Sequence, residues 1–268
     1  LSLNRLLVIA NVSDEGAGLP AALADRSDRW AMSDLGLFMS ELKLAARPCR
    51  DFLRKLRVRD ESCEHYSIVS SLHLASADVG REAQQAITDL LQTEQCKLRS
   101  LDLSFTSIDG YALVTTMRTN ASLTSLDVRA VPRMKDLFKT IGDVLLGSGV
   151  SCKLGCFRCD NFEIVEGQKS LNRREQLFEG GELRLIVGLM KHNTFLEDVD
   201  FSATDLESDA SDVKLPGTYE IQQLATILQV HPSLLEFKIQ YNPAIDEPTR
   251  EALRTAAANR EPPINLLL

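Results

Sequence analysis

A chain of 268 residues with a formal net charge of −8 presents no basic field for nucleic-acid phosphates or anionic lipid, so we expect no nucleic-acid partner. No stretch of about eighteen apolar residues occurs, so we expect no membrane span. Six cysteines are too few to form the disulfide scaffold of a chain this long, and they indicate reduced thiols in an intracellular, cytoplasmic protein.

The first 67 residues lack the periodic pattern that follows them. Residues 29–47 and 48–59 have the apolar spacing of two helices. One face of the first helix would carry Leu35, Phe38, Met39 and Leu42. We interpret residues 1–67 as an N-terminal helical cap or a degenerate first repeat, which would cover the open edge of the repeats that follow. The missing initiator methionine suggests a fragment or a processed product of a longer chain.

A repeat begins near Ile68. Six segments share the pattern L-x-x-L-x-L, with other apolar residues allowed at the L positions. They are Val69-Leu72-Leu74, Leu98-Leu101-Leu103, Leu123-Leu126-Val128, Leu154-Phe157-Cys159, Leu196-Val199-Phe201 and Leu234-Phe237-Ile239. Their spacing fits a period of about 28 residues with two late insertions. Each segment predicts a strand with its second and third apolar residues toward the core.

Helical patterns separate these strands. They cover the segments REAQQAITDLLQ (81–92), YALVTTMRTN (111–120), MKDLFKTIGDVLL (134–146), ELRLIVGLMKHN (182–193) and EIQQLATILQVH (220–231). Asn120, Asn193 and His231 each stand three residues before the next first apolar position. We expect these residues to cap the C-terminal ends of their helices, since Asn tolerates the left-handed conformation that stops a helix.

The segments DGYALVTTMRTNASLTSLDV and ELRLIVGLMKHNTFLEDVDF resemble the ribonuclease-inhibitor-like class of leucine-rich repeats. Similar repeats occur in tropomodulin, the Ran GTPase-activating protein and the sensor domains of NOD-like receptors. The resemblance covers about residues 68–268. It implies an α/β solenoid, a right-handed horseshoe of about six repeats with parallel strands on the concave face and helices on the convex face. The resemblance also implies that the chain binds other proteins.

One feature departs from that family. Its members usually carry Asn, Cys or Thr three residues beyond the third apolar position, where the side chain hydrogen-bonds to the backbone. Here the position holds Ala77, Thr106, Val131, Phe162, Thr204 and Asn242. We therefore expect an incomplete ladder of such bonds.

The repeat pattern divides the chain into three parts. The N-terminal cap covers residues 1–67, the repeats cover 68–246, and a C-terminal capping helix with a short strand covers 247–268. Insertions near 165–181 and 205–218 interrupt the repeats, and we expect both to be surface loops.

The concave face is the best candidate for a binding site, because residues beside the second and third apolar positions point away from the core. The side chains predicted to contact a partner are His73, Asp102, Asp127, Arg129, Arg158, Asp160, Asp198, Asp200, Glu236 and Lys238. Acids outnumber bases in this set. Neighbours such as Asp102 and Asp127 should repel each other modestly and favour a partner with a basic surface. The alternative is a hydrophilic face that only keeps the chain soluble.

The stretch CKLGCFRC, residues 152–159, raises a chemical alternative. The spacing of Cys152, Cys156 and Cys159 resembles the cluster-binding loop of radical SAM enzymes, which implies a cysteine-ligated iron–sulfur or zinc protein. The strand pattern opposes this, because it turns Cys159 toward the core and leaves Cys156 as an exposed thiol on the other face. We expect no metal and no cofactor.

These observations predict a non-catalytic scaffold or adaptor for protein–protein interaction, as a subunit or domain of a larger assembly. No phosphate-binding loop, dinucleotide fingerprint or nucleophile elbow occurs in the sequence to indicate an enzyme. Regulation of a small GTPase or of actin stays open, by analogy of fold alone.

Overall fold

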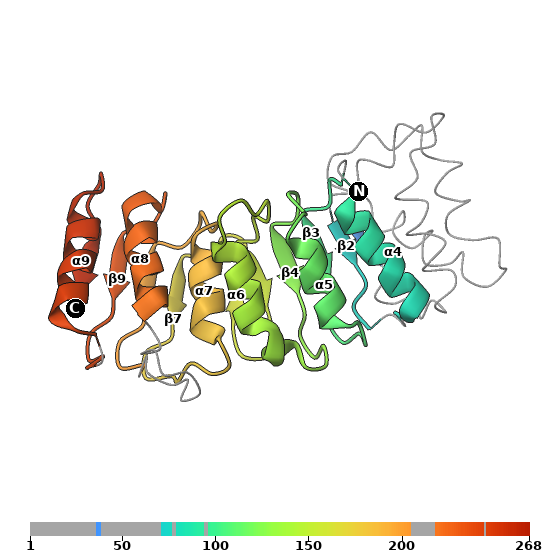
Figure 1. Ribbon diagram of the computed structural model, residues 1–268, viewed down its shortest axis with the longest axis horizontal. Coiled ribbons are helices and arrows are strands. Elements are labelled where there is room, and N and C mark those ends of the chain that lie inside the picture. Colours follow the sequence, from blue (N-terminus) through green and yellow to red (C-terminus); the bar gives the residue numbers. More distant parts are fainter. Residues whose placement is uncertain (1–35, 39–70, 77–78, 94–95, 205–217, 244) are drawn as a thin grey trace. The chain divides into compact units, whose positions relative to one another are not determined.

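The computed structural model describes residues 36–38, 71–76, 79–93, 96–204, 218–243 and 245–268, which are coloured in Figure 1. The chain forms two compact units. The first comprises residues 1–134, 151–153 and 158–162; the second comprises residues 135–150, 154–157 and 163–268. The class is α/β with parallel strands, as the sequence predicts.

The described strands of the first unit form a parallel sheet in chain order. They are β1 (Gly36–Phe38), β2 (Ser71–His73), β3 (Ser100–Asp102) and β4 (Ser125–Asp127). Leu72, Leu101 and Leu126 are register partners on β2–β4, and all three are buried. Helices α4 (Arg81–Gln92) and α5 (Gly110–Met117) connect these strands and lie on one side of them (Figure 1).

Strand β1 falls inside a region predicted to be helical. Its Leu37 pairs in parallel with Leu72 of β2, so the helix predicted over residues 29–47 is wrong at Gly36–Phe38. The rest of residues 1–67 lies outside the described residues.

The second unit repeats the arrangement. Strands β7 (Ser170–Asn172), β8 (Asp198–Asp200), β9 (Glu236–Lys238) and β10 (Asn265–Leu267) pair in parallel in that order. Between them run α7 (Glu182–Met190), α8 (Thr218–Val230) and α9 (Glu247–Ala258), side by side in Figure 1. The 3-10 turn η4 (Met134–Leu137), α6 (Phe138–Leu146) and β6 (Glu163–Ile164) precede β7, and α6 packs against α7.

All six predicted strand segments contain a strand centred on the second apolar residue. Besides β2–β4, β8 and β9, this includes β5 (Cys156–Arg158), whose Arg158 belongs to the first unit and whose other residues belong to the second. The five predicted helices and the final helix and strand are likewise present. Local apolar periodicity was therefore a sufficient guide to these elements.

The prediction of a surface loop at residues 165–181 is wrong, because β7 lies within it and is paired with β8. In this strand Leu171 corresponds to the second apolar position of the predicted segments, and Arg173 to the core-facing third. Arg173 is buried there, forms an ion pair with buried Glu182, and lies 5.6 Å from the centre of the Phe178 ring. A charged residue at a core position hid this strand from the sequence pattern. Residues 205–217, in the other predicted insertion, lie outside the described residues.

The prediction that Asn120 and Asn193 cap the C-terminal ends of their helices is wrong, because the C-caps of α5 and α7 are Arg118 and Lys191. None of Asn120, Asn193 and His231 has a positive φ. Instead the buried Asn193 accepts the backbone N–H groups of Phe195 and Leu196 (2.8 and 2.9 Å) and donates to the Gly155 carbonyl (2.9 Å). Each such side chain organises the turn that leads into the next strand.

A left-handed residue follows six of the described strands, β2–β4 and β7–β9, at one fixed place, two residues beyond the third core position. These residues are Ser76, Phe105, Ala130, Glu175, Ala203 and Tyr241, with φ between 55° and 59°. β7 shares this feature through Glu175, which places it in the same series as the strands predicted from sequence. β5 does not share it.

Aromatic rings fill much of the core of the second unit. Phe201 packs edge-on against Phe178 and Phe237, with ring centres 5.5 and 5.6 Å apart. Burying an aromatic or branched side chain of this size is worth about 2–3 kcal/mol. Alternate strand residues point to the opposite face and are half-exposed, so this core fixes where the polar side chains of the strands lie.

Candidate functional site

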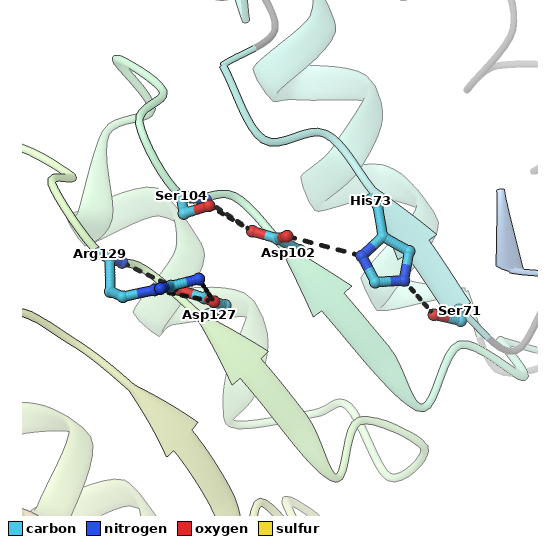
Figure 2. A network of polar contacts seen from close by, with 6 residues as sticks. All are labelled: Ser71, His73, Asp102, Ser104, Asp127 and Arg129. Carbon is cyan, nitrogen blue, oxygen red and sulfur yellow. Dashed lines mark hydrogen bonds and ion pairs between the residues drawn. The ribbon is translucent and has the colours of Figure 1, made fainter. Parts of the chain in front are cut away.

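The polar side of the strands in the first unit carries a chain of side-chain contacts (Figure 2). Asp102 of β3 is its centre. Its Oδ1 accepts the Ser104 N–H (2.9 Å) and hydroxyl (2.7 Å), and its Oδ2 lies 3.5 Å from His73 Nδ1 on β2. Burial alone would raise the pKa of Asp102, but the hydrogen bonds from His73 and Ser104 outweigh burial and lower it. The carboxylate is therefore held ionised.

Asp127, one strand along, has a partner of its own. Arg129 Nε donates to Asp127 Oδ1 (3.0 Å), and Arg129 Nη2 donates to Oδ2 (2.6 Å). The backbone N–H of Arg129 also donates to Oδ1 (3.1 Å). The side chain of Asp127 is only 10% exposed. Asp102 and Asp127 are register partners, as predicted, but these local hydrogen bonds offset the repulsion expected between them. The Asp127 carboxylate therefore stabilises the turn after β4, and we no longer favour it as a contact for a partner.

The two remaining predicted residues of this unit also lie close to β4. Exposed Asp160 accepts the Ala130 N–H at 2.9 Å, and the Arg158 carbonyl accepts the Val128 N–H at 2.9 Å. The predicted acids of the first unit therefore accept backbone N–H groups of the segments that follow the strands.

In the second unit, Lys238 of β9 binds two acids at once. Its Nζ lies 2.6 Å from Glu236 on the same strand and 3.0 Å from Asp198 on β8. Hydrogen bonds to Glu236 and Asp198 raise the pKa of Lys238, so it remains charged. The row continues on both sides, since Ser170 donates to Asp198 (3.4 Å) and Asn265 donates to Glu236 (2.7 Å). The sequence predicted Asp198, Glu236 and Lys238 as contact residues, but it predicted neither Ser170 and Asn265 nor the ion pairs that neutralise the charges.

Asp200 differs from the other acids. Its Oδ1 accepts the Ser202 N–H at 2.9 Å, while Oδ2 has no partner among the described residues. Its register partners are Asn172 on β7 and Lys238 on β9. Asn172 fills the same role on its own strand, accepting the Arg174 N–H at 2.9 Å. Asp200 is therefore a half-exposed carboxylate with one oxygen available to a partner.

Two aromatic residues stand exposed on the left-handed turns. Phe105 follows β3 and is 60% exposed, and Tyr241 follows β9 and is 71% exposed. The left-handed conformation costs an L-residue about 1–2 kcal/mol, which glycine would avoid. Core packing does not account for either ring.

The cysteine segment differs from expectation at one residue. Cys159 is buried, as predicted, and its Sγ lies 3.4 Å from the Phe162 carbonyl. Cys156, predicted to be an exposed thiol, is buried as well. Burial, with a smaller contribution from Glu166, raises its pKa to about 11, so it stays a protonated, weakly nucleophilic thiol at neutral pH.

Neither a protein-family model nor a curated protein matches the chain. No three His, Cys, Asp or Glu side chains within the described ranges converge as metal ligands would. Among the helices that the structure describes, none is both long and apolar enough to cross a membrane.

Sequence reasoning missed three contributors to these surfaces. Ser104, which follows the core-facing Leu103, is buried and donates its hydroxyl to Asp102. Asn172 lay in a predicted loop. Tyr241 carried no signal, since its exposure depends on a backbone conformation that only its place in the turn could reveal.

Proposed function

We propose that the chain is a leucine-rich repeat protein of the ribonuclease-inhibitor-like class, a right-handed horseshoe, and that it acts as a non-catalytic scaffold or adaptor for protein–protein interaction in a larger assembly. The support is a local arrangement that recurs at fixed offsets: a strand centred on the second apolar residue, a left-handed turn residue, a helix, and a polar side chain that leads into the next strand.

The hydrogen bonds at the ladder position support the same proposal. Thr204 Oγ1 donates to the Phe201 carbonyl (2.8 Å), and the Thr204 N–H donates to Asn242 Oδ1 (3.1 Å). Asn242 Nδ2 in turn donates to the Phe201 and Ile239 carbonyls (2.8 and 3.0 Å). Both side chains are fully buried. Such a side chain ties one strand end to the next, which is the role expected of this position in a repeat.

The binding surface that we favour is the polar face of β7–β10, and the observation that carries it is Asp200. Its open carboxylate oxygen lies in a row of otherwise neutralised side chains, so a cationic side chain of a partner would find its acceptor there. The net charge of −8 would attract a basic partner over a longer range.

Tyr241 gives this surface an aromatic anchor. It follows Gln240, whose carbonyl accepts the Ala203 N–H at 2.8 Å, so the turns after β8 and β9 lie side by side. Large exposed aromatic side chains supply much of the energy at protein interfaces. Because Ala130 and Ala203 hold the same turn position elsewhere, the turn does not require a large side chain, and a contact role accounts for the exposed ring of Tyr241.

The proposal is tested by comparing variants in affinity purification with quantitative mass spectrometry. Asp200→Lys reverses the open charge and Tyr241→Gly removes the ring while relieving the turn. Because glycine adopts positive φ readily, Tyr241→Gly should leave the free energy of unfolding unchanged or raise it by up to about 1 kcal/mol. Both variants should recover about 5- to 30-fold less of the specific partners than the parent chain, as expected for loss of a contact worth about 1–2 kcal/mol.

Glu251→Lys on α9 is the matched control, because it makes the same charge reversal at an exposed helix residue. It should retain the partners. If the Asp200 and Tyr241 variants recover the same proteins in the same amounts as Glu251→Lys, the polar face of β7–β10 is not the binding surface.

A further inference from the structure

Three side chains of the first unit are arranged as a nucleophile, a base and an orienting acid (Figure 2). Ser71 and His73 are two residues apart on β2, so their side chains leave the same face of the strand. Asp102 is the register partner of His73 on β3. Ser71 Oγ lies 3.0 Å from His73 Nε2, and His73 Nδ1 lies 3.5 Å from Asp102 Oδ2. Two paired strands therefore hold all three groups side by side.

The hydrogen bonds determine which ring nitrogen carries the proton. Ser104 donates both its N–H and its hydroxyl to Asp102 Oδ1, which holds the carboxylate ionised and leaves Oδ2 toward the ring. An ionised carboxylate only accepts hydrogen bonds, so Nδ1 carries the ring proton. Nε2 is then the acceptor for the Ser71 hydroxyl. This is the proton order that lets an imidazole act as a general base toward serine.

We propose that Ser71 is a nucleophile activated by His73, and that it takes up an acyl group from an activated ester. In this step a bond forms between Ser71 Oγ and the ester carbonyl carbon, and the bond from that carbon to the leaving oxygen breaks. The hydroxyl proton passes to His73 Nε2 and then to the leaving oxygen, which departs as an alcohol. The result is one acyl group per chain, a modification rather than turnover. It is independent of partner binding by the second unit.

The chain contains its own comparison serines. Ser100 of β3 is the register partner of Ser71, and Ser125 of β4 is the register partner of Ser100; all three are half-exposed. Each of the three is followed two residues later by a polar residue, but only for Ser71 is that residue a histidine. Access and strand geometry are thus matched, and the neighbouring base is what differs.

The substitution Asp102→Asn tests the role of the acid with little disturbance of the fold. Asn172 of β7 stands at the equivalent place and accepts the backbone N–H of Arg174 through Oδ1, as Asp102 does with Ser104. An amide facing Nδ1 can donate its own hydrogen to that nitrogen. The ring proton then moves to Nε2, which can no longer accept the proton of Ser71.

The experiment treats the full chain with an alkyl fluorophosphonate, which reports nucleophilic serines by forming an Oγ–P bond and releasing fluoride. Peptide mass spectrometry then gives the rate of labelling at each serine. General base assistance contributes about 100-fold or more, so Ser71 should label at least about tenfold faster than Ser100 and Ser125. His73→Gln and Asp102→Asn should lower the Ser71 rate to that of the two comparison serines.

Equal labelling of the three serines in the parent chain overturns the proposal, and so does a Ser71 rate that Asp102→Asn leaves unchanged. Far-ultraviolet circular dichroism and urea unfolding establish that each variant is folded. If His73→Gln is unfolded, Asp102→Asn decides the outcome alone. An aryl acetate used as a second reagent should add one acetyl group at Ser71 in the parent chain and none in Ser71→Ala.

Discussion

The stability of the second unit should depend on the protonation of one buried histidine. His231 lies in the turn between α8 and β9, and its Nδ1 accepts the N–H groups of Ser233 and Leu234 (3.4 and 3.1 Å). The ring is neutral in this arrangement. Burial, with a smaller contribution from the charge of Arg260, lowers the pKa of His231 from 6.5 to about 4.

The direction of the pH effect on stability follows from the pKa of His231 in the folded and in the unfolded chain. Between pH 6.5 and about 4 the unfolded chain protonates His231 while the folded chain does not. The stability given by the neutral ring is therefore complete above pH 6.5 and is lost as the pH falls toward 4. At about 1.4 kcal/mol per pH unit, the loss reaches roughly 2–3 kcal/mol by pH 4.5.

The variant that isolates this effect is His231→Asn. Asn120 and Asn193 hold the equivalent turn position and accept the equivalent N–H groups, so the turn should survive. The smaller side chain should cost about 1–2 kcal/mol at pH 7. The decisive quantity is how steeply the free energy of unfolding falls with pH, measured by urea unfolding followed by circular dichroism between pH 7 and 4.5. The parent chain should lose roughly 2–3 kcal/mol more than the variant over this range. Parallel curves would mean that His231 takes up its proton equally in both states, and the prediction would fail.

Three further substitutions test the packing of the second unit by the same unfolding measurement. In Gly142→Ala the added Cβ would lie 2.6 Å from the Arg184 carbonyl carbon, so α6 and α7 must separate, at a cost of about 1–3 kcal/mol; an equally stable variant contradicts this close approach. Glu182→Gln leaves Arg173 buried without its counter-charge and should cost about 3–5 kcal/mol, whereas replacing both residues by Met should cost much less; equal losses would count against the buried pair. Asn242→Ala removes the side-chain partner of the Thr204 N–H and of the Ile239 carbonyl and should cost about 2–3 kcal/mol, and a loss below about 0.5 kcal/mol would show that the ladder does not stabilise the strands.

The candidate site could be predicted only as a list of side chains. Strand alternation correctly turned Asp102, Asp127 and Asp200 away from the core, because alternate residues of a strand face opposite sides. It could not distinguish among them. Ser104 and His73 hold Asp102, Arg129 encloses Asp127, and Asp200 keeps an open oxygen. Which donors reach each carboxylate depends on the turn after each strand and on the strand beside it.

Local pattern by itself determined the class, the six predicted strands and the helices between them, because apolar periodicity and turn residues act within one element. Tertiary structure decided the rest. It placed Arg173 in the core, where Glu182 compensates its charge, and so made a strand of a predicted loop. It also buried Cys156 and brought His73 beside Asp102. Burial and cross-strand contacts arise only when distant segments pair, so no pattern within a single segment contains them.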